Sequence, residues 1–147
     1  MKIPLSTAEQ LIIDNTISHV KKELAKAEGG HDWWHILRVW TTAKHIANTE
    51  KVNHFIVQLG ALLHDIADSK FHGGDETIGP QNAKAYLESQ NVSQEIIKHV
   101  IAIIANISFK GGNFQQSFNS LELDVVQDAD RLDAIGAIGV ALSLIHI

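Results

Sequence analysis

Apolar residues recur at intervals of three and four positions along most of the chain, and no stretch alternates strictly between apolar and polar residues. This pattern predicts an all-α fold. Ser6 followed by Glu9 has the spacing of a capping box, and Pro80 suits the first turn of a helix. Six helices are expected: from the Ser6 cap to Leu24, from the Asp32 cap to about Asn48, from Asn53 to about Ala67, from about Pro80 to near Asn91, from the Ser93 cap to Asn106, and from about Leu121 onward.

The composition is that of a single globular domain. The chain has 147 residues, of which 45% are apolar, and its net charge of −5 argues against nucleic acid held on a broad basic face. The absence of cysteine excludes disulfides and thiolate zinc sites. Neither a signal-peptide pattern nor an apolar stretch of the roughly 20 residues needed to span a membrane is visible. A cytoplasmic protein without membrane contact is therefore expected.

The C-terminal stretch is unusually apolar. From Ala134 to Ile147 the only polar side chains are Ser143 and His146. Such a helix would aggregate if it were exposed, so it is interpreted as a core helix whose covering residues are absent. We therefore expect residues 1–147 to form one domain that lacks its C-terminal part, and a homodimer through this helix is one expected consequence.

Candidate metal chemistry centres on His64 and Asp65, which close an apolar run. Burying an imidazole and a carboxylate is costly unless both find partners, and a divalent cation satisfies both, although a mutually hydrogen-bonded pair would also do so. His35 lies on an earlier predicted helix, and Asp130 lies in an acidic cluster on the last one. Packed helices can direct such side chains to one centre. Two imidazoles and two carboxylates suit Mn, Fe, Co, Ni or Zn better than Ca, and leave coordination positions open for water and substrate.

Three segments carry a family resemblance. Gly30-His31-Asp32-Trp33-Trp34-His35-Ile36-Leu37-Arg38-Val39, Ala61-Leu62-Leu63-His64-Asp65-Ile66-Ala67-Asp68 and Gln127-Asp128-Ala129-Asp130-Arg131-Leu132-Asp133-Ala134-Ile135-Gly136 together resemble the HD-domain metal-dependent phosphohydrolases, and more narrowly their small stand-alone bacterial members. The resemblance covers roughly residues 10 to 140. It implies an HD-domain helical bundle around a metal site, with His35, His64, Asp65 and Asp130 as ligands of one divalent metal. Mn is the first expectation, with Fe, Co, Ni, Zn or Mg as alternatives.

Two of these ligand positions have neighbouring rivals. His31 shares a helix face with His35, because residues four apart are neighbours on a helix, and the resemblance favours His35. Asp128 competes with Asp130, which is preferred. Asp128 or Asp133 would then orient an imidazole from outside the coordination sphere.

Further residues are candidates for catalysis and substrate binding. Asp68 lies four residues after His64, so a shared helix face would let it take a proton from the attacking water. Lys70 is assigned a catalytic and phosphate-binding role, and Lys110 a phosphate-binding role, although loop lysines are commonly just solvated. Arg38, one turn after His35, can reach either a substrate phosphate or an acidic ligand of the metal.

The predicted activity follows from the resemblance. It implies hydrolysis of phosphate esters or anhydrides of a small phosphorylated metabolite, above all a nucleotide, with pyrophosphate release from nucleoside triphosphates as the leading version. The alternatives are a phosphomonoesterase that removes a nucleotide's 5′-phosphate, and an HD module that binds metal or nucleotide without turnover. Members of the family normally continue for tens of residues beyond the helix that carries Asp130, and this sequence departs from them there.

Overall fold

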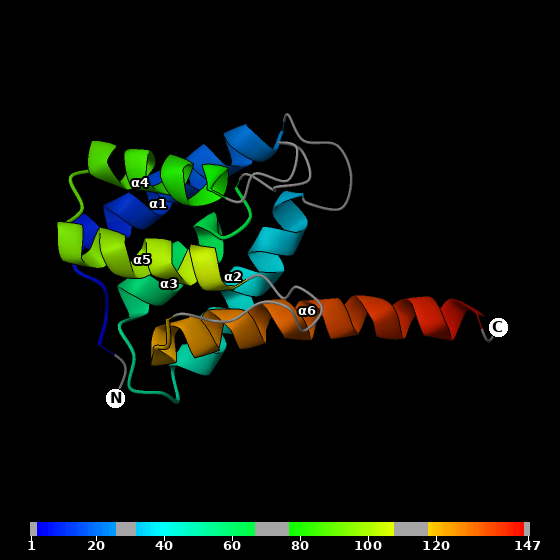
Figure 1. Ribbon diagram of the computed structural model, residues 1–147. Helices are drawn as coiled ribbons and strands as arrows, with labels where there is room; N and C mark the ends of the chain where they lie inside the picture. The colour runs from blue at the N-terminus through cyan, green and yellow to red at the C-terminus, as the bar shows by residue number, and fades with distance from the viewer. Residues whose placement is uncertain (1–2, 26–31, 67–76, 108–117, 146–147) are drawn as a thin grey trace.

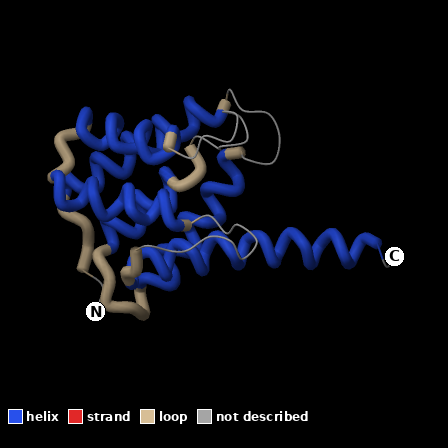
Figure 2. The backbone as a smooth tube through the Cα atoms, in the orientation of Figure 1, coloured by secondary structure: helices blue, strands red, loops and turns tan. Residues whose placement is uncertain are grey.

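The fold is an all-α bundle, as predicted. The computed structural model describes residues 3–25, 32–66, 77–107 and 118–145, with residues 137–145 described by their backbone alone. Within these ranges the chain forms six helices and no strand (Figure 2). The helices are α1 (Thr7–Leu24), α2 (Trp33–Ala47), α3 (His54–Leu63), α4 (Ile78–Ser89), α5 (Gln94–Asn106) and α6 (Leu121–Ile145).

Polar side chains cap the first two helices at the positions that the sequence predicted. Ser6 and Glu9 form the capping box: the Ser6 hydroxyl accepts from the Glu9 amide at 3.1 Å, and the Glu9 carboxylate accepts from the Ser6 amide at 2.9 Å. Asp32 caps α2 by accepting from the backbone amide of His35 at 3.1 Å. This bond fixes the first turn of α2, which carries the His35 side chain.

Helix α3 lies at the centre of the bundle. Every residue from Phe55 to Leu63 is buried, and the helix packs against α1, α2, α5 and α6. A helix that is apolar on all sides is stable only when neighbours cover it completely. Gly60 allows α5 and α6 to approach closely, because a Cβ there would lie 3.3 Å from a methyl group of Ile103 and 3.4 Å from one of Val126. The position of α3 therefore determines where His64, its C-terminal cap, is placed.

The end of α3 differs from the prediction. The helix stops at Leu63 instead of continuing to about Ala67, and His64 and Asp65 lie in the turn that follows. The His64 Nδ1 donates to the Ala61 carbonyl oxygen at 2.7 Å, and this oxygen is the acceptor that a continued helix would offer to the Asp65 amide. The apolar pattern up to Ile66 gave no sign of this competition. The described residues thus lend no support to a helix face shared with Asp68, which lies outside them.

Helix α6 packs along α2 and then extends beyond the other helices (Figure 1). Leu132 and Ile135 on this helix are 53% and 64% exposed. Two expectations about this helix stay predictions: that the residues covering it are absent, and that it mediates a homodimer. Among the described residues, no helix combines the length and apolarity needed to cross a membrane.

Candidate metal centre

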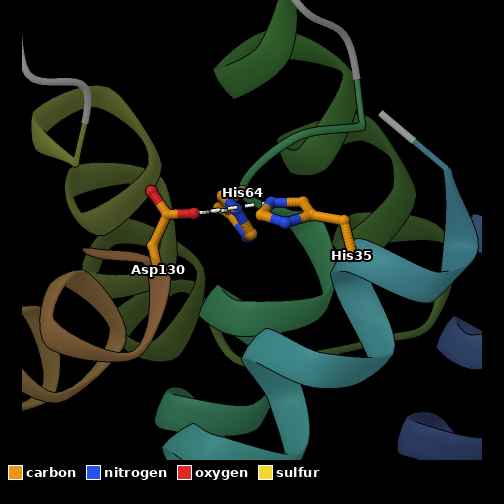
Figure 3. A group of neighbouring side chains, drawn as sticks. All are labelled: His35, His64 and Asp130. Atoms are coloured by element: carbon orange, nitrogen blue, oxygen red, sulfur yellow. Dashed lines mark ion pairs between the residues drawn. The ribbon is translucent and has the colours of Figure 1, made fainter. Parts of the chain in front are cut away.

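Three helices bring His35, His64 and Asp130 to one point (Figure 3). His35 comes from the first turn of α2, His64 from the end of α3, and Asp130 from the middle of α6. The Asp130 Oδ1 lies 3.4 Å from the Nε2 atoms of both His35 and His64. One potential ligand atom from each residue lies within 4.8 Å of the other two. Residues far apart in the sequence therefore form a compact group with the donor types of a metal site.

The His64 ring shows most directly that something is needed at this point. Its side chain is only 3% exposed. Its Nδ1–H donates to the Ala61 carbonyl, so in the neutral ring the lone pair resides on Nε2. Within the described part of the chain, this buried Nε2 has no hydrogen-bond partner. The Asp130 Oδ1 lies 3.4 Å away, but a lone pair on Nε2 and a carboxylate oxygen are both acceptors. A bound metal ion would satisfy this nitrogen and remove the cost of leaving it unpaired.

The His35 ring is held from the opposite side by a carboxylate. Its Nδ1 lies 2.7 Å from the Asp133 Oδ2, and its Nε2 faces Asp130. Metal-binding histidines usually donate their second ring N–H to such a partner, which fixes the tautomer and the direction of the ring. Asp133 therefore lies where it can orient the His35 ring from outside the coordination sphere. The sequence had left this role open between Asp128 and Asp133.

Asp65 lies at the edge of the centre. Its Oδ2 is 3.7 Å from the His35 Nε2, yet the compact group of three does not include it. Its role as the fourth ligand stays a prediction. With or without Asp65, two imidazole nitrogens and carboxylate oxygen fit a divalent transition metal better than the all-oxygen cage that Ca²⁺ prefers.

Ionisation in the group is strongly coupled. The hydrogen-bonding interaction with Asp130 is the largest cause that raises the pKa of His35, and with Asp133 and Asp65 it outweighs the opposing effect of burial to bring that pKa to about 9. For His64, burial lowers the pKa, but Asp130, Asp65 and the Ala61 carbonyl together raise it above its usual value.

The two carboxyl groups shift in the opposite direction. Burial acts to raise the pKa of Asp130, yet the two imidazoles hold it well below its usual range. The Arg38 guanidinium, followed by His35, lowers the pKa of the Asp133 carboxyl. In this group each imidazole favours ionisation of the neighbouring carboxylates, and each carboxylate favours protonation of the neighbouring imidazoles. A metal ion that binds the imidazole nitrogens would compete with protons for them.

The remaining predicted site residues divide into two groups. Arg38 is bound to Asp133, with its Nε donating to Oδ1 at 2.6 Å and its Nη2 donating to Oδ2 at 3.3 Å. The residues Asp68, Lys70, Lys110 and His31 lie outside the described residues.

The structure also separates the rival acids of α6. Asp128 is exposed and does not belong to the compact group, whereas Asp130 does. The pairing of Arg38 with Asp133 is the contact that sequence reasoning missed. The sequence signal for this pairing is spacing alone. Arg38 follows His35 by three positions and Asp133 follows Asp130 by three, so each lies one turn further along its own helix.

The structure is an all-α domain in which a His-His-Asp group could hold a metal ion, and comparison with known proteins identifies the family. Residues 33–135 match the HD domain family. The chain is 40% identical over 125 residues to the protein YpgQ of Bacillus subtilis (strain 168). It is also similar to a crystal structure of an HD-superfamily hydrolase from Bacillus thuringiensis, with 41% identity and a TM-score of 0.74. A crystal structure of Bacillus subtilis YpgQ in complex with ADP gives 35% identity and a TM-score of 0.73.

This chain belongs to the HD domain family. The match to YpgQ involves 83% of this chain but only 60% of YpgQ. The two crystal structures are matched over 94% and 95% of this chain, and over 65% and 67% of their own chains. The chain thus spans about two thirds of the length of these relatives, and the described HD domain lies within the shared part.

The geometry of the centre generates a direct prediction about metal binding. His64→Ala removes the buried nitrogen that faces Asp130, so affinity for Mn²⁺ should fall by more than about 100-fold, beyond what the loss of an outer partner costs. Asp130→Asn should act in the same direction. Binding can be measured by calorimetric titration of the metal-free protein, with the exposed His45→Ala as the matched control. Unchanged affinity in folded His64→Ala would place the metal elsewhere.

Proposed function

We propose that this HD domain hydrolyses a phosphoanhydride bond of a nucleotide at a centre that holds one divalent metal ion, releasing pyrophosphate from a nucleoside triphosphate. The observation that carries the proposal is the convergence of His35, His64 and Asp130, in which the buried His64 Nε2 has no hydrogen-bond partner among the residues that the structure describes. His35, His64 and Asp130 would hold the metal, with Asp65 as a fourth ligand. Mn²⁺ is the metal we propose first.

A relative supports a nucleotide as the substrate class. YpgQ of Bacillus subtilis has a crystal structure in complex with ADP, a nucleotide that itself contains a phosphoanhydride. At 35% identity over 95% of this chain, the HD domain is shared between the two proteins. A site that binds a nucleoside diphosphate is chemically suited to the corresponding triphosphate, which adds one further phosphoanhydride.

The metal supplies two kinds of chemistry when bound: it lowers the pKa of water in its coordination sphere and it polarises a phosphoryl oxygen. In the proposed reaction, the water oxygen bonds to the α-phosphorus of the triphosphate. The bond from that phosphorus to the oxygen that bridges the α- and β-phosphates breaks, and that oxygen leaves with pyrophosphate. The nucleoside monophosphate retains the new oxygen, and the proton released from the water must be accepted by a base.

Three residues outside the described ranges complete the proposal. Asp68 follows the His64-Asp65 pair closely in the sequence and would accept the proton of the attacking water. Lys70 and Lys110 would offset negative charge on the departing pyrophosphate. Arg38 is the remaining candidate for a phosphate contact, although the structure shows it bound to Asp133.

The proposed activity can be tested by the products of a nucleotide panel. The metal-free protein is incubated with nucleoside tri-, di- and monophosphates after addition of Mn²⁺, Co²⁺, Zn²⁺ or Mg²⁺, and pyrophosphate and phosphate are quantified separately. We expect metal-dependent release of pyrophosphate from triphosphates, with His64→Ala as the inactive control. Phosphate release from monophosphates would instead show a phosphomonoesterase. Tight binding of metal without any turnover would favour a non-catalytic module.

The roles of Asp68 and Lys70 can be separated by kinetics. Asp68→Asn should retain the metal and lower kcat by roughly 10²- to 10⁴-fold, the usual contribution of a positioned acid or base. Lys70→Ala should raise KM more than it lowers kcat if the ammonium contacts ground state and transition state alike. Asp124→Asn and Lys51→Ala, at exposed positions, are the matched controls. Full activity of Asp68→Asn would contradict its role in proton transfer.

A further inference from the structure

Two helices each carry a pair of residues with the same spacing, and the two pairs are joined to one another. On α2, Arg38 follows His35 by three positions; on α6, Asp133 follows Asp130 by three positions. Residues three apart lie one above the other on a helix face. Helices α2 and α6 pack together, so His35 on α2 lies next to Asp130 on α6. One turn further along both helices, Arg38 pairs with Asp133.

Both oxygens of the Asp133 carboxylate are engaged. Its Oδ1 accepts from the Arg38 Nε at 2.6 Å, and its Oδ2 lies 2.7 Å from the His35 Nδ1 and accepts from the Arg38 Nη2 at 3.3 Å. A guanidinium that binds a carboxylate through two nitrogens fixes its orientation as well as its position. The rotation of the Asp133 side chain is therefore set by Arg38, and the orientation of the His35 ring is set by Asp133.

The consequence for His35 concerns its tautomer and its direction. A carboxylate can only accept, so in the neutral imidazole the proton lies on Nδ1, next to Asp133, and the lone pair lies on Nε2. That Nε2 is the atom that faces Asp130 at 3.4 Å. Without Asp133, the neutral ring would be free to place its proton on Nε2 and to turn, and either change removes the lone pair from the centre.

We propose that Asp133 and Arg38 are positioning residues of the metal centre: Asp133 holds the His35 ring in the tautomer and direction that metal binding needs, and Arg38 holds Asp133. In this role Arg38 does not contact substrate phosphate. It affects metal binding indirectly, because it holds Asp133, and Asp133 in turn orients the His35 ring. The inference rests on the metal centre of the proposed function, but it does not depend on which nucleotide, if any, is hydrolysed.

The test measures Mn²⁺ affinity in the absence of nucleotide. Calorimetric titrations are made on the wild-type chain, Asp133→Asn, Arg38→Gln and the double variant. Asp124→Asn is the matched control for Asp133→Asn, and Arg131→Gln is the matched control for Arg38→Gln. Both controls make the same change of charge at exposed positions, which lie on α6. The melting temperature of each metal-free protein is recorded alongside, so that a purely structural effect is seen separately.

We expect Asp133→Asn to weaken Mn²⁺ binding by about 10- to 100-fold, the usual cost of losing an outer partner of a metal-binding histidine. Arg38→Gln should weaken it by a smaller factor, because Asp133 is still present but less firmly held. In the Asp133→Asn background, Arg38→Gln should have no further effect, since the two residues act through one path. Asp133→Glu, which restores the carboxylate, should recover part of the affinity. The two control variants should bind Mn²⁺ as the wild type does.

Several results would overturn the inference. Mn²⁺ affinity in Asp133→Asn that equals that of Asp124→Asn would show that Asp133 does not position His35, even if the melting temperature falls. Unchanged Mn²⁺ affinity in Arg38→Gln, combined with a raised KM for nucleotide, would make Arg38 a substrate-binding residue. If Asp133→Asn does not fold, Arg38→Gln decides alone, because the Arg38 side chain is 57% exposed. A wild-type chain that binds no Mn²⁺ would refute the proposed metal centre itself, which is a different outcome from failure of the positioning role.

Discussion

The need to satisfy a buried imidazole at the end of a fully buried helix is the constraint on which this structure depends. Helix α3 is covered on all sides, so the residue that caps it is placed in the interior whatever its chemistry. That residue is His64, whose Nδ1 donates to the Ala61 carbonyl, whereas its Nε2 has no hydrogen-bond partner among the described residues. The other nitrogen faces Asp130, whose helix packs against both α2 and α3. The fold therefore brings a buried imidazole nitrogen next to a carboxylate, and this arrangement suits a divalent metal.

Much of the fold was accessible from the sequence because the helix signals are local. The Ser6–Glu9 capping box and the Asp32 cap each involve residues three apart, and both form as predicted. The end of α3 was predicted too late because the apolar pattern continues to Ile66. The helix ends where the His64 side chain donates to the Ala61 carbonyl, and apolar periodicity carries no information about such a bond.

The site was only partly predictable, for a related reason. The sequence favoured Asp130 over Asp128, but spacing alone does not separate the two, because the choice depends on how α6 is rotated against α2 and α3. That rotation is a result of packing, which leaves Asp128 exposed and Asp130 next to both histidines. In the same way, Arg38 had two chemically reasonable partners, a phosphate or an acid. The contact with Asp133 joins residues on two different helices and became visible only when α2 and α6 were placed side by side.

The central claim is that His35, His64 and Asp130 bind one metal ion, and anomalous diffraction from crystals soaked in Mn²⁺ tests it most directly. We predict a single strong anomalous peak at about 2 Å, the usual coordination distance, from the Nε2 atoms of His35 and His64 and from a carboxylate oxygen of Asp130. A peak at a different group of residues, or the absence of any peak at this centre in crystals where Mn²⁺ has access to it, would contradict the claim.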